Sequence, residues 1–374
     1  MQTRAAVLWS VGSPWSVETI ELDTPGPQEV LVRIVAAGLC HTDEHAVTGD
    51  VAYPLPMIGG HEGAGIVESV GAAVTSIVPG DHVVMNFVPS CGVCPSCVSG
   101  LQNLCDRGAK IAEGPALDGT YRAHARGQDL SAGNLLGAFA DHSVVHESSV
   151  VKIEQDIPLE LAALVSCGVA TGWGSSVYAG GVRAGETVVV IGIGGIGMNA
   201  VQGARSAGAA NIVVVDPIDW KRERAKVFGA THEAPDTASA LALVAEITHG
   251  RMADCAILAT PTAESAYLGP AVNLVGKRGR VVVTAIGAAK QSTIELNLAE
   301  VTFWEKTVRG ALYGSGNPRF DIPNLLRLYR GGDLKLDELI THRYSLDEVN
   351  DGYEDMRRGR SLRGVLIMDA DLTG

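Results

Sequence analysis

The first part of the chain is a series of short apolar segments separated by glycine, proline and polar residues. Such segments, bounded by turn residues, predict short strands. They lie at 5–9, 16–22, 29–38, 65–71 and 81–88. Strands of this length and spacing predict a small mixed β-barrel rather than a helical domain.

From Glu186 onward the pattern changes to strand, helix, strand. An apolar run at 187–192 is followed by a glycine-rich turn that opens a helix, and then by a second apolar strand at 211–216. The alternation continues with helices at 219–228 and 265–275 and with strands at 254–260, 279–287 and 307–314. This alternation predicts a parallel sheet covered by helices. The expected fold class is therefore α/β, a mixed barrel followed by a doubly wound parallel domain.

Three other parts of the chain complete the pattern. Residues 106–143 are glycine-rich and predict a long loop with short strands. Residues 158–178 predict a helix that breaks at Gly168, where the barrel-like sequence gives way to the second pattern. The last part predicts helices at 322–332 and 346–359 and a final strand at 364–369.

Composition narrows the class of protein. At 374 residues the chain exceeds the usual size of a single core, so two domains are expected. A net charge of −13 with no basic block argues against nucleic acid or an anionic membrane as partner. No apolar run is expected to span a bilayer, and Met1 leads into a strand-like segment rather than a signal peptide. These features favour a cytoplasmic enzyme.

Four of the seven cysteines form one tight motif, Cys91-x2-Cys94-x2-Cys97-x7-Cys105. Four thiols on a short segment with glycine and proline match a closed Cys₄ zinc site, and such a metal would be structural. The alternatives are unpaired thiols or two disulfides. Disulfides are unusual in a reducing cytoplasm, and cysteines so close in sequence are poorly placed to bridge one another. Cys255, in a predicted buried strand, is expected to be plain core.

The stretch from Leu39 to Gly71 places a thiol and an imidazole, Cys40 and His61, in one short region, with Thr42 and His45 beside them. Thiolate and imidazole are ligands that Zn²⁺ selects, and two ligands from one loop need only a third from elsewhere. Glycines at 59, 60, 63 and 65 allow sharp turns and close approach of the backbone. The alternative is a glycine-rich turn between strands with an incidental histidine and a buried free cysteine. These residues alone leave both interpretations open.

The turn from Gly192 to Gly197, with the sequence GIGGIG, follows a predicted strand and opens a predicted helix. Asp216 closes the next strand at the distance typical of a dinucleotide-binding fingerprint. The helix N-terminus would hold a pyrophosphate. Asp216 would accept hydrogen bonds from the adenosine ribose and repel a 2′-phosphate, which favours NAD(H) over NADP(H); Arg222 nearby complicates this preference. The alternative is a glycine-rich turn in another kind of doubly wound domain.

These motifs occur in an order that resembles one family over essentially the whole chain. Cys40, Gly60-His61-Glu62, the four-cysteine lobe, Cys167 and GIGGIG follow one another as in the zinc-containing medium-chain alcohol dehydrogenases. The stretches GLCHTDEHAVTGD, DGTYRAHARGQD and VVVDPIDWKRERA are similar to the actinobacterial nitrosoaniline-dependent alcohol dehydrogenases, nicotinoproteins that hold NAD(H) through the cycle. The resemblance implies a GroES-like mixed-barrel catalytic domain over 1–168 and 312–374, with a zinc lobe at about 91–105, and an NAD-binding Rossmann domain over 169–311.

The resemblance also implies roles for individual residues. Cys40, His61 and Cys167 would hold a catalytic zinc with a fourth position open, in addition to the structural zinc. Thr42 and His45 would carry the alcohol's proton, while Asp43 would orient the His61 ring and Glu62 would approach the metal. The implied cofactor contacts are His41 and Arg363 with the pyrophosphate, Asp216 and Lys221 with the ribose, Thr171 beside the nicotinamide, and the turn residues Gly192, Gly194, Gly195, Ile196 and Gly197. Phe87 is expected beside the substrate. Alternatively, Asp43 and His45 are surface residues and Phe87 is core.

The implied activity is the interconversion of alcohols and aldehydes by hydride transfer, with two zinc ions per chain and a tightly bound NAD(H) that an external redox carrier reoxidises. Related glutathione-dependent formaldehyde dehydrogenases carry charged residues where this chain has Val51, Tyr53 and Gly108, so a plain alcohol is expected rather than a thiol adduct. The alternatives are an ordinary enzyme that exchanges NAD and a non-catalytic zinc protein that binds NAD. A homo-oligomer, either a dimer or a tetramer, is expected.

Overall fold

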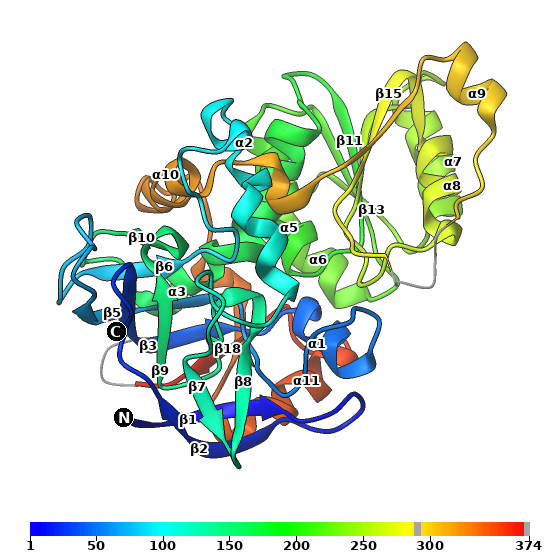
Figure 1. Ribbon diagram of the computed structural model, residues 1–374. Helices are drawn as coiled ribbons and strands as arrows, with labels where there is room; N and C mark the ends of the chain where they lie inside the picture. The colour runs from blue at the N-terminus through cyan, green and yellow to red at the C-terminus, as the bar shows by residue number, and fades with distance from the viewer. Residues whose placement is uncertain (288–292, 370–374) are drawn as a thin grey trace. The chain divides into compact units, whose positions relative to one another are not determined.

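The computed structural model of the chain describes residues 1–287 and 293–369 (Figure 1). These residues form two compact units. Unit 1 comprises Met1–Cys167, Asn317–Gly332 and the chain from Leu336 onward, and unit 2 comprises Gly168–Gly316 and Asp333–Lys335. The last residues of the implied catalytic domain, 370–374, lie outside the described residues.

Unit 1 contains a closed barrel of short strands. In order around the barrel they are β1 (Gln2–Leu8), β2 (Ser16–Leu22), β7 (Ala123–Ala125), β8 (Gln128–Ala132) and β4 (Met57–Ile58). Alternate residues of β1 and β2 face the interior, where Val7, Ile20 and Leu22 pack together. The pair β4–β8 is parallel and the other pairs are antiparallel, which confirms the predicted mixed barrel.

A second sheet of unit 1 is centred on β3. Its strands, in order, are β10 (Val150–Lys152), β6 (His82–Met85), β5 (Gly63–Val70), β3 (Glu29–Gly38), β18 (Arg363–Ile367) and β17 (Ile340–Tyr344), and β9 (His142–His146) also pairs with β3. Every residue of β3 except Arg33 is buried. A continuous apolar run is the pattern of a strand that is covered on both faces, so β3 forms the core of this unit.

The helices of unit 1 are α1 (His41–Thr48), α2 (Pro95–Val98), α3 (Leu159–Leu164), α10 (Pro318–Arg330) and α11 (Val349–Arg357). Helix α1 corrects the expectation that Cys40 and His61 share one loop, because the chain becomes helical directly after Cys40. Asp43 and Glu44 in its first turn favour the helix N-terminus, and Gly49 ends it in the left-handed conformation at φ 76°.

Short 3₁₀ helices connect these elements: η1 (Gln102–Leu104), η2 (Asp106–Ala112), η3 (Gly133–Leu135), η4 (Glu147–Ser149), η8 (Asp337–Leu339) and η9 (Leu346–Glu348). The segment 106–143, expected to be a loop with short strands, therefore contains η2, β7, β8 and η3. Each of these elements is short, so much of the segment is irregular, as predicted.

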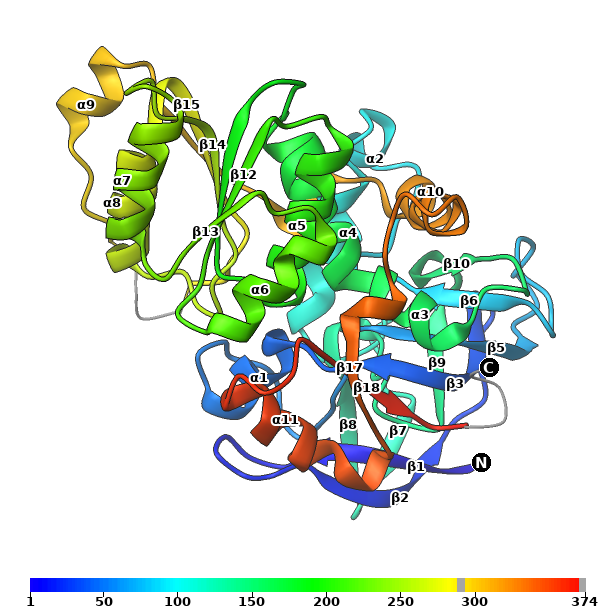
Figure 2. The same ribbon diagram turned by 180° about the vertical axis from the view of Figure 1, so that it is seen from behind.

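Unit 2 is a doubly wound parallel sheet, as predicted. Its strands, in order, are β13 (His232–Ala234), β12 (Asn211–Val215), β11 (Thr187–Ile191), β14 (Ala253–Leu258), β15 (Val275–Val283) and β16 (Thr307–Gly310), and every pair is parallel. Its helices are α4 (Ala170–Gly174), α5 (Gly195–Ser206), α6 (Asp219–Phe228), α7 (Thr237–Ile247), α8 (Ser265–Leu274) and α9 (Leu298–Phe303). Figures 1 and 2 show α5 and α6 on one face of the sheet and α7 and α8 on the other.

Strand β16 is shorter than the strand predicted at 307–314. It ends at Gly310, and the chain then forms η7 (Leu312–Ser315). Tyr313 and Gly314 have positive φ angles of 53° and 63°, which an extended strand does not permit.

The predicted helix break at Gly168 is wrong. The chain is helical from Leu159 to Ala179, with π-helical turns at η5 (Val165–Val169) and η6 (Ser175–Ala179). A π turn accommodates an extra residue without ending the helix, so the glycine does not break it. Contrary to expectation, this segment is long and apolar enough to cross a membrane by length and hydropathy alone. However, 89% of its apolar window is buried inside the protein, as in the core helix of a soluble protein.

Candidate metal and cofactor sites

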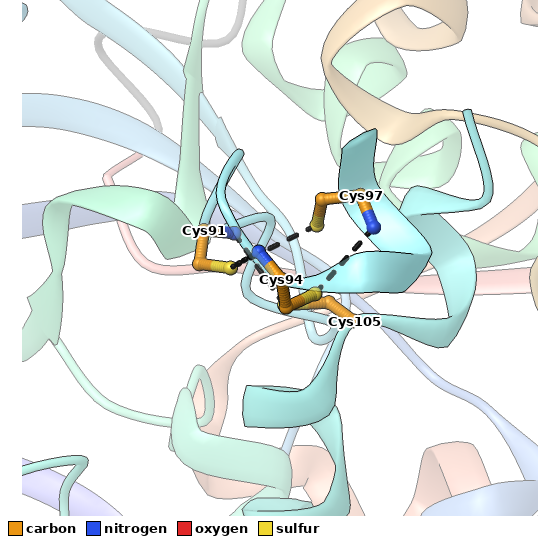
Figure 3. Close-up of side chains that lie close together, drawn as sticks. All are labelled: Cys91, Cys94, Cys97 and Cys105. Carbon is orange, nitrogen blue, oxygen red and sulfur yellow. Dashed lines mark hydrogen bonds between the residues drawn. The ribbon is translucent and has the colours of Figure 1, made fainter. Parts of the chain in front are cut away.

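The four cysteines of the 91–105 segment come together in unit 1 (Figure 3). Their sulfur atoms all lie within 4.8 Å of one another. The Sγ atoms of Cys91 and Cys97 are 3.9 Å apart, and those of Cys94 and Cys105 are 4.0 Å apart. A disulfide requires about 2.05 Å, so the alternative of two disulfides is wrong and all four thiols are free.

Backbone amides point at these sulfurs. The N–H of Cys94 donates to Cys91 Sγ at 3.3 Å, and the N–H of Cys97 donates to Cys94 Sγ at 3.4 Å. The amide of Val93 is the main cause that lowers the pKa of Cys91 to about 6, whereas burial raises the pKa of Cys97 to about 12. Amide donors favour a thiolate at Cys91, and a bound cation would offset the burial that disfavours a thiolate at Cys97. The donor set therefore fits a closed tetrahedral Zn²⁺ site.

Replacing Cys94 with serine is expected to remove zinc from this lobe and to destabilise the protein. Loss of a bound metal is one of the few single changes that cost more than about 4 kcal/mol. At roughly 2–4 °C per kcal/mol, the melting temperature should fall by about 10 °C. Zinc content by mass spectrometry and thermal unfolding by circular dichroism measure both effects. Cys255→Ser, a change at a buried cysteine in β14 outside this lobe, is the control and should keep its zinc. Unchanged zinc content in Cys94→Ser would contradict the assignment.

A second cluster forms where two paired strands of unit 1 end. Strands β3 and β5 are antiparallel, with Ala37 opposite Gly63. Cys40 follows β3 and His61 precedes β5, so the pairing brings these two residues together. Gly60 has φ 88°, and a Cβ on it would lie 2.6 Å from the backbone nitrogen of Phe139. Only glycine fits there, which is the close approach that the sequence predicted.

Cys167 reaches the same place from the π-helical turn η5. The ligand atoms of Cys40, His61, Glu62 and Cys167 lie within 4.8 Å of one another, and all four residues are buried. Nε2 of His61 and Oε1 of Glu62 are buried, and neither makes a hydrogen bond to any described residue. Two thiols, one imidazole nitrogen and one nearby carboxylate are the donors of an open zinc site, so these residues fit Zn²⁺.

Asp43 lies directly behind the ring of His61. Its Oδ2 is 3.0 Å from His61 Nδ1, and its Oδ1 accepts a hydrogen bond from the N–H of Gly60 at 3.0 Å. Burial alone would lower the pKa of His61, but the charges of Asp43 and Cys40 raise it well above its ordinary value. The hydrogen bond with Cys167 is the largest cause that lowers the pKa of Cys40 well below its ordinary value. The cluster thus stabilises a thiolate beside an imidazole whose orientation is fixed.

Glu62 forms a buried ion pair with Arg363, the first residue of β18. Burial raises the pKa of Glu62 to about 8, against the opposing charge of Arg363. A Cβ at Gly38 would lie 2.2 Å from Glu62 Oε2 and 2.8 Å from Arg363 Nη2, so the ion pair requires glycine at that position. The sequence implied a pyrophosphate contact for Arg363 but not this ion pair. The two residues are 301 positions apart, and no local pattern relates them.

The remaining residues predicted near this cluster lie on α1 or beside His61. Thr42 Oγ1 is 3.7 Å from Cys40 Sγ, and His41 is the first residue of the helix. Asp43 and His45 are only 2% and 6% exposed, so the alternative that they are surface residues is wrong. The ring of Phe87 packs edge-on against that of His61, with centroids 5.8 Å apart. Phe87 is therefore buried beside the metal cluster.

Tyr353 on α11 was not singled out by the sequence. Its hydroxyl donates to the carbonyl oxygen of Cys40 at 3.4 Å, and the side chain is 1% exposed. Trp15 stacks on its ring with centroids 6.2 Å apart. Because Tyr353 lies 313 positions from Cys40, only the tertiary fold could reveal that it supports this residue.

In unit 2 the glycine turn lies between β11 and α5. Gly192 has φ 88°, and a Cβ on Gly197 would lie 1.9 Å from the carbonyl oxygen of Gly192, so both positions require glycine. Gly194 is the N-cap of α5. The first turn of the helix consists of Gly195, Ile196 and Gly197. Its free N–H groups and dipole suit a phosphate group, as the fingerprint predicts.

Asp216 follows β12 and braces this turn. Its Oδ2 accepts a hydrogen bond from the N–H of Ile193 at 2.8 Å, and its Oδ1 accepts one from the N–H of Ile218 at 2.9 Å. Arg222 donates to the carbonyl oxygen of Asp216 at 2.6 Å. Burial lowers the pKa of Lys221, although the charge of Asp216 opposes this. Five polar groups thus gather at the carboxyl end of β12 or in the turns beside it, where the ribose contacts are expected: the Asp216 carboxylate, Lys221, Arg222 and the N–H groups of Ile193 and Ile218.

Thr171 lies on α4 in unit 2 and is buried. Its carbonyl oxygen accepts a hydrogen bond from Ser175 Oγ at 2.6 Å. A separate small pocket, partly open to solvent, lies in unit 1 beside Glu29, Arg122 and Ser149. None of the predicted site residues lines it. The candidate site therefore rests on the convergence of donor atoms and not on this pocket.

Known proteins resemble the chain over its whole length. Residues 26–155 match the family described as Alcohol dehydrogenase GroES-like domain, and residues 195–330 match the family described as Zinc-binding dehydrogenase. An NDMA-dependent alcohol dehydrogenase from Amycolatopsis methanolica is 51% identical, and the match covers 99% of this chain and 100% of that relative.

Solved structures agree with this relation. Benzyl alcohol dehydrogenase from Acinetobacter calcoaceticus has a TM-score of 0.92 at 30% identity, over 99% of this chain and 100% of that chain. An alcohol dehydrogenase zinc-binding domain protein from Burkholderia ambifaria has a TM-score of 0.92 at 32% identity, over 99% of both chains. The chain therefore belongs to the zinc-containing medium-chain alcohol dehydrogenases, oxidoreductases with a GroES-like and a Rossmann-like domain that use Zn²⁺ and NAD(H).

Proposed function

We propose that this alcohol dehydrogenase keeps its NAD(H) bound through the catalytic cycle and that an external redox carrier reoxidises the cofactor in place. The observation that carries this proposal is the 51% identity, over essentially the whole chain, to an enzyme named for its dependence on NDMA, a nitrosoaniline dye. Dependence on an external electron acceptor supports a cofactor that is reoxidised on the enzyme rather than exchanged. The substrates are small alcohols and aldehydes.

The proposed catalytic site is the buried cluster of Cys40, His61 and Cys167 in unit 1, with Glu62 beside it and Asp43 fixing the His61 ring. When bound, Zn²⁺ supplies the Lewis acidity that polarises an alcohol, and NAD⁺ supplies the hydride acceptor. The arrangement supports this role because the two thiols, the imidazole and the carboxylate are already gathered and shielded from water.

Alcohol oxidation also releases a proton, and residues of α1 are placed to remove it. Thr42 is 3.7 Å from the Cys40 sulfur, so its hydroxyl lies beside the proposed metal position. His45 is buried on the same helix, and its Nδ1 is 3.4 Å from Asp50 Oδ2. The side chain of Asp50 is 40% exposed. We assign Thr42 as the first proton acceptor and His45 as the outer group, with Asp50 as the exit to solvent.

The cofactor contacts are proposed mainly in unit 2. The turn from Gly192 to Gly197 would hold the pyrophosphate, Asp216 and Lys221 would contact the adenosine ribose, and Thr171 would lie beside the nicotinamide. In unit 1, His41 and Arg363 would contact the pyrophosphate and Phe87 the substrate. We therefore propose that unit 1 is the catalytic domain and unit 2 the NAD-binding domain.

The proposed substrate class rests on positions that are charged in the related glutathione-dependent enzymes and uncharged here. Val51, Tyr53 and Gly108 offer no charge for a glutathione adduct, and the Tyr53 hydroxyl is engaged with Asn134 Oδ1 at 3.1 Å. Phe87, packed against the His61 ring, adds an apolar surface. These features support a plain alcohol or aldehyde as substrate rather than a thiol adduct.

Assembly and location are also proposed. Strand β16 is the last strand of its sheet, and all four of its residues are exposed. Phe303 and Leu298 of the preceding helix are 82% and 74% exposed. An unprotected edge strand beside apolar side chains invites pairing, which supports a homo-oligomer, either a dimer or a tetramer. All seven cysteines are free, which supports a reducing, cytoplasmic location.

Cofactor retention is tested by gel-filtering the purified protein, denaturing it and assaying the supernatant for NAD(H). We expect about one NAD(H) per chain. Turnover of an alcohol with a nitrosoaniline dye should proceed without added NAD, and the alcohol alone should raise the reduced-nicotinamide absorbance of the protein. A cofactor-free supernatant, together with activity that requires added NAD, would identify an ordinary exchanging dehydrogenase. No alcohol oxidation in zinc-replete protein supplied with NAD would point to a non-catalytic protein.

A further inference from the structure

Ser166 is a fully buried residue of unit 1 that neither the sequence nor the family resemblance assigns to the site. It lies in the π-helical turn η5, directly before Cys167. Its hydroxyl is 2.6 Å from the carbonyl oxygen of Met85 and 3.2 Å from the carbonyl oxygen of His61. The Ser166 side chain therefore joins the turn that carries Cys167, one proposed zinc ligand, to the backbone of His61, another proposed ligand.

The two carbonyl groups belong to the segments that carry the site. His61 is itself a proposed ligand and precedes β5, and Met85 ends β6 two positions before Phe87. Strands β5 and β6 pair with each other, so both carbonyls lie at the end of the sheet where the cluster forms. The single hydroxyl hydrogen serves the nearer carbonyl of Met85 and lies within reach of that of His61, so Ser166→Ala removes a buried donor from the junction of both segments.

The π-helical geometry of η5 is a further reason why the Ser166 hydroxyl is needed to hold this turn. Its hydrogen-bond pattern is wider than that of an α-helix, and π turns are short and rare. The position of the Cys167 sulfur depends on how this turn is held against β5 and β6. The Cys167 sulfur lies within 4.8 Å of the ligand atoms of His61 and Cys40, close enough for the three residues to share one ion. The hydroxyl of the adjacent Ser166 reaches the ends of both β5 and β6, so it is placed to hold the Cys167 thiol in this position.

We propose that Ser166 is a positioning residue for the catalytic zinc, which it supports by fixing the η5 turn and Cys167 against the backbone of His61 and Met85. The inference rests on the proposed zinc site of Cys40, His61 and Cys167. Ser166 is not itself one of the proposed ligands. It belongs to the groups that orient metal ligands, whose loss typically lowers metal affinity by about 10- to 100-fold.

The test is to measure zinc binding in Ser166→Ala by competition with a chelator. We expect the affinity of one of the two zinc sites to fall by about 10- to 100-fold, while the Cys₄ zinc is released as in the unmodified protein and serves as the internal reference. In protein with Co²⁺ at the site of Cys40, His61 and Cys167, the ligand-field and thiolate bands of the absorption spectrum should shift. The reason is that the Cys167 sulfur is held less precisely in this variant. A purely structural role for Ser166 would not change this spectrum.

Ser176→Ala is the matched control. Ser176 is equally buried in the same helical segment, and its hydroxyl donates to a carbonyl oxygen of another segment, that of Ala200 at 2.5 Å. This variant should bind both zinc ions normally. Unchanged affinity and an unchanged Co²⁺ spectrum in Ser166→Ala, or equal loss of both zinc ions, would overturn the inference. A single zinc ion in the unmodified, active protein would instead refute the proposed zinc site itself.

Discussion

Replacing Cys40 with serine is expected to lower the rate of alcohol oxidation by at least about 10³-fold while leaving the fold intact. The Lewis acidity of a catalytic metal is worth several kcal/mol, and each 1.4 kcal/mol corresponds to about tenfold in rate. A serine hydroxyl is a poor zinc ligand, so zinc content should fall from two ions to one per chain.

The fold should survive because the backbone at Cys40 is held by other groups. Its carbonyl oxygen accepts hydrogen bonds from the N–H of Asp43 at 3.2 Å and from the hydroxyl of Tyr353 at 3.4 Å. Neither bond involves the sulfur. Thermal unfolding should therefore stay close to that of the unmodified protein, in contrast to Cys94→Ser.

Steady-state oxidation of a primary alcohol, together with zinc content on the same sample, measures the effect. Cys94→Ser is the comparison. It should also lose one zinc ion, but its main effect should be a lower melting temperature. Full activity in Cys40→Ser, or loss of both zinc ions with unfolding, would show that Cys40 is not a ligand of a separate catalytic metal.

The parts of the site that are local in sequence could be predicted from spacing alone. The four cysteines of the zinc lobe lie within 15 positions, so the chain between them fixes their distances, and the sulfur atoms do converge within 4.8 Å. The glycine turn was likewise predictable, because Gly192 and Gly197 are required by a positive φ and by a close backbone approach. The binding of a metal by the four cysteines and the binding of a cofactor by the glycine turn stay predictions.

The other cluster depends on contacts between distant segments. Cys167 could be joined to Cys40 and His61 only through the family resemblance, because 106 positions separate it from His61. The Glu62–Arg363 ion pair and the Tyr353 contact had no local signal at all, since they depend on how β18 and α11 pack in unit 1. The break predicted at Gly168 failed because glycine propensity is weak beside the packing of a buried helix, which tolerates a π turn instead.

A change of cofactor preference is expected when Asp216 is replaced with glycine. The Asp216 carboxylate is proposed to accept hydrogen bonds from the adenosine ribose and to repel a 2′-phosphate. Like charges placed together cost several kcal/mol, so the ratio of NAD(H) to NADP(H) affinity should fall by roughly 10²- to 10³-fold. Binding of each cofactor to protein stripped of its own NAD(H), measured by fluorescence or calorimetry, gives this ratio.

The size of the increase in NADP(H) affinity should depend on Arg222. Its guanidinium lies at the carboxyl end of β12, where it donates to the carbonyl oxygen of Asp216 at 2.6 Å and to Asp219 Oδ1 at 2.5 Å. Without the Asp216 carboxylate, Arg222 is, together with Lys221, a cation available to a 2′-phosphate. Asp216→Gly should therefore bind NADP(H) more tightly than the unmodified protein does, and Asp216→Gly with Arg222→Gln should lose that gain while NAD(H) binding stays weak.

A second effect of Asp216 must be separated from the first. Its two oxygens also accept the N–H groups of Ile193 and Ile218, so glycine loosens the phosphate-binding turn as well. Asp216→Asn removes the charge but keeps one oxygen to brace the turn, and it should lose less NAD(H) affinity than Asp216→Gly while still relieving the repulsion of NADP(H). If both variants weaken NAD(H) and NADP(H) equally, Asp216 acts only as a brace for the turn, and the selection of NAD(H) lies elsewhere.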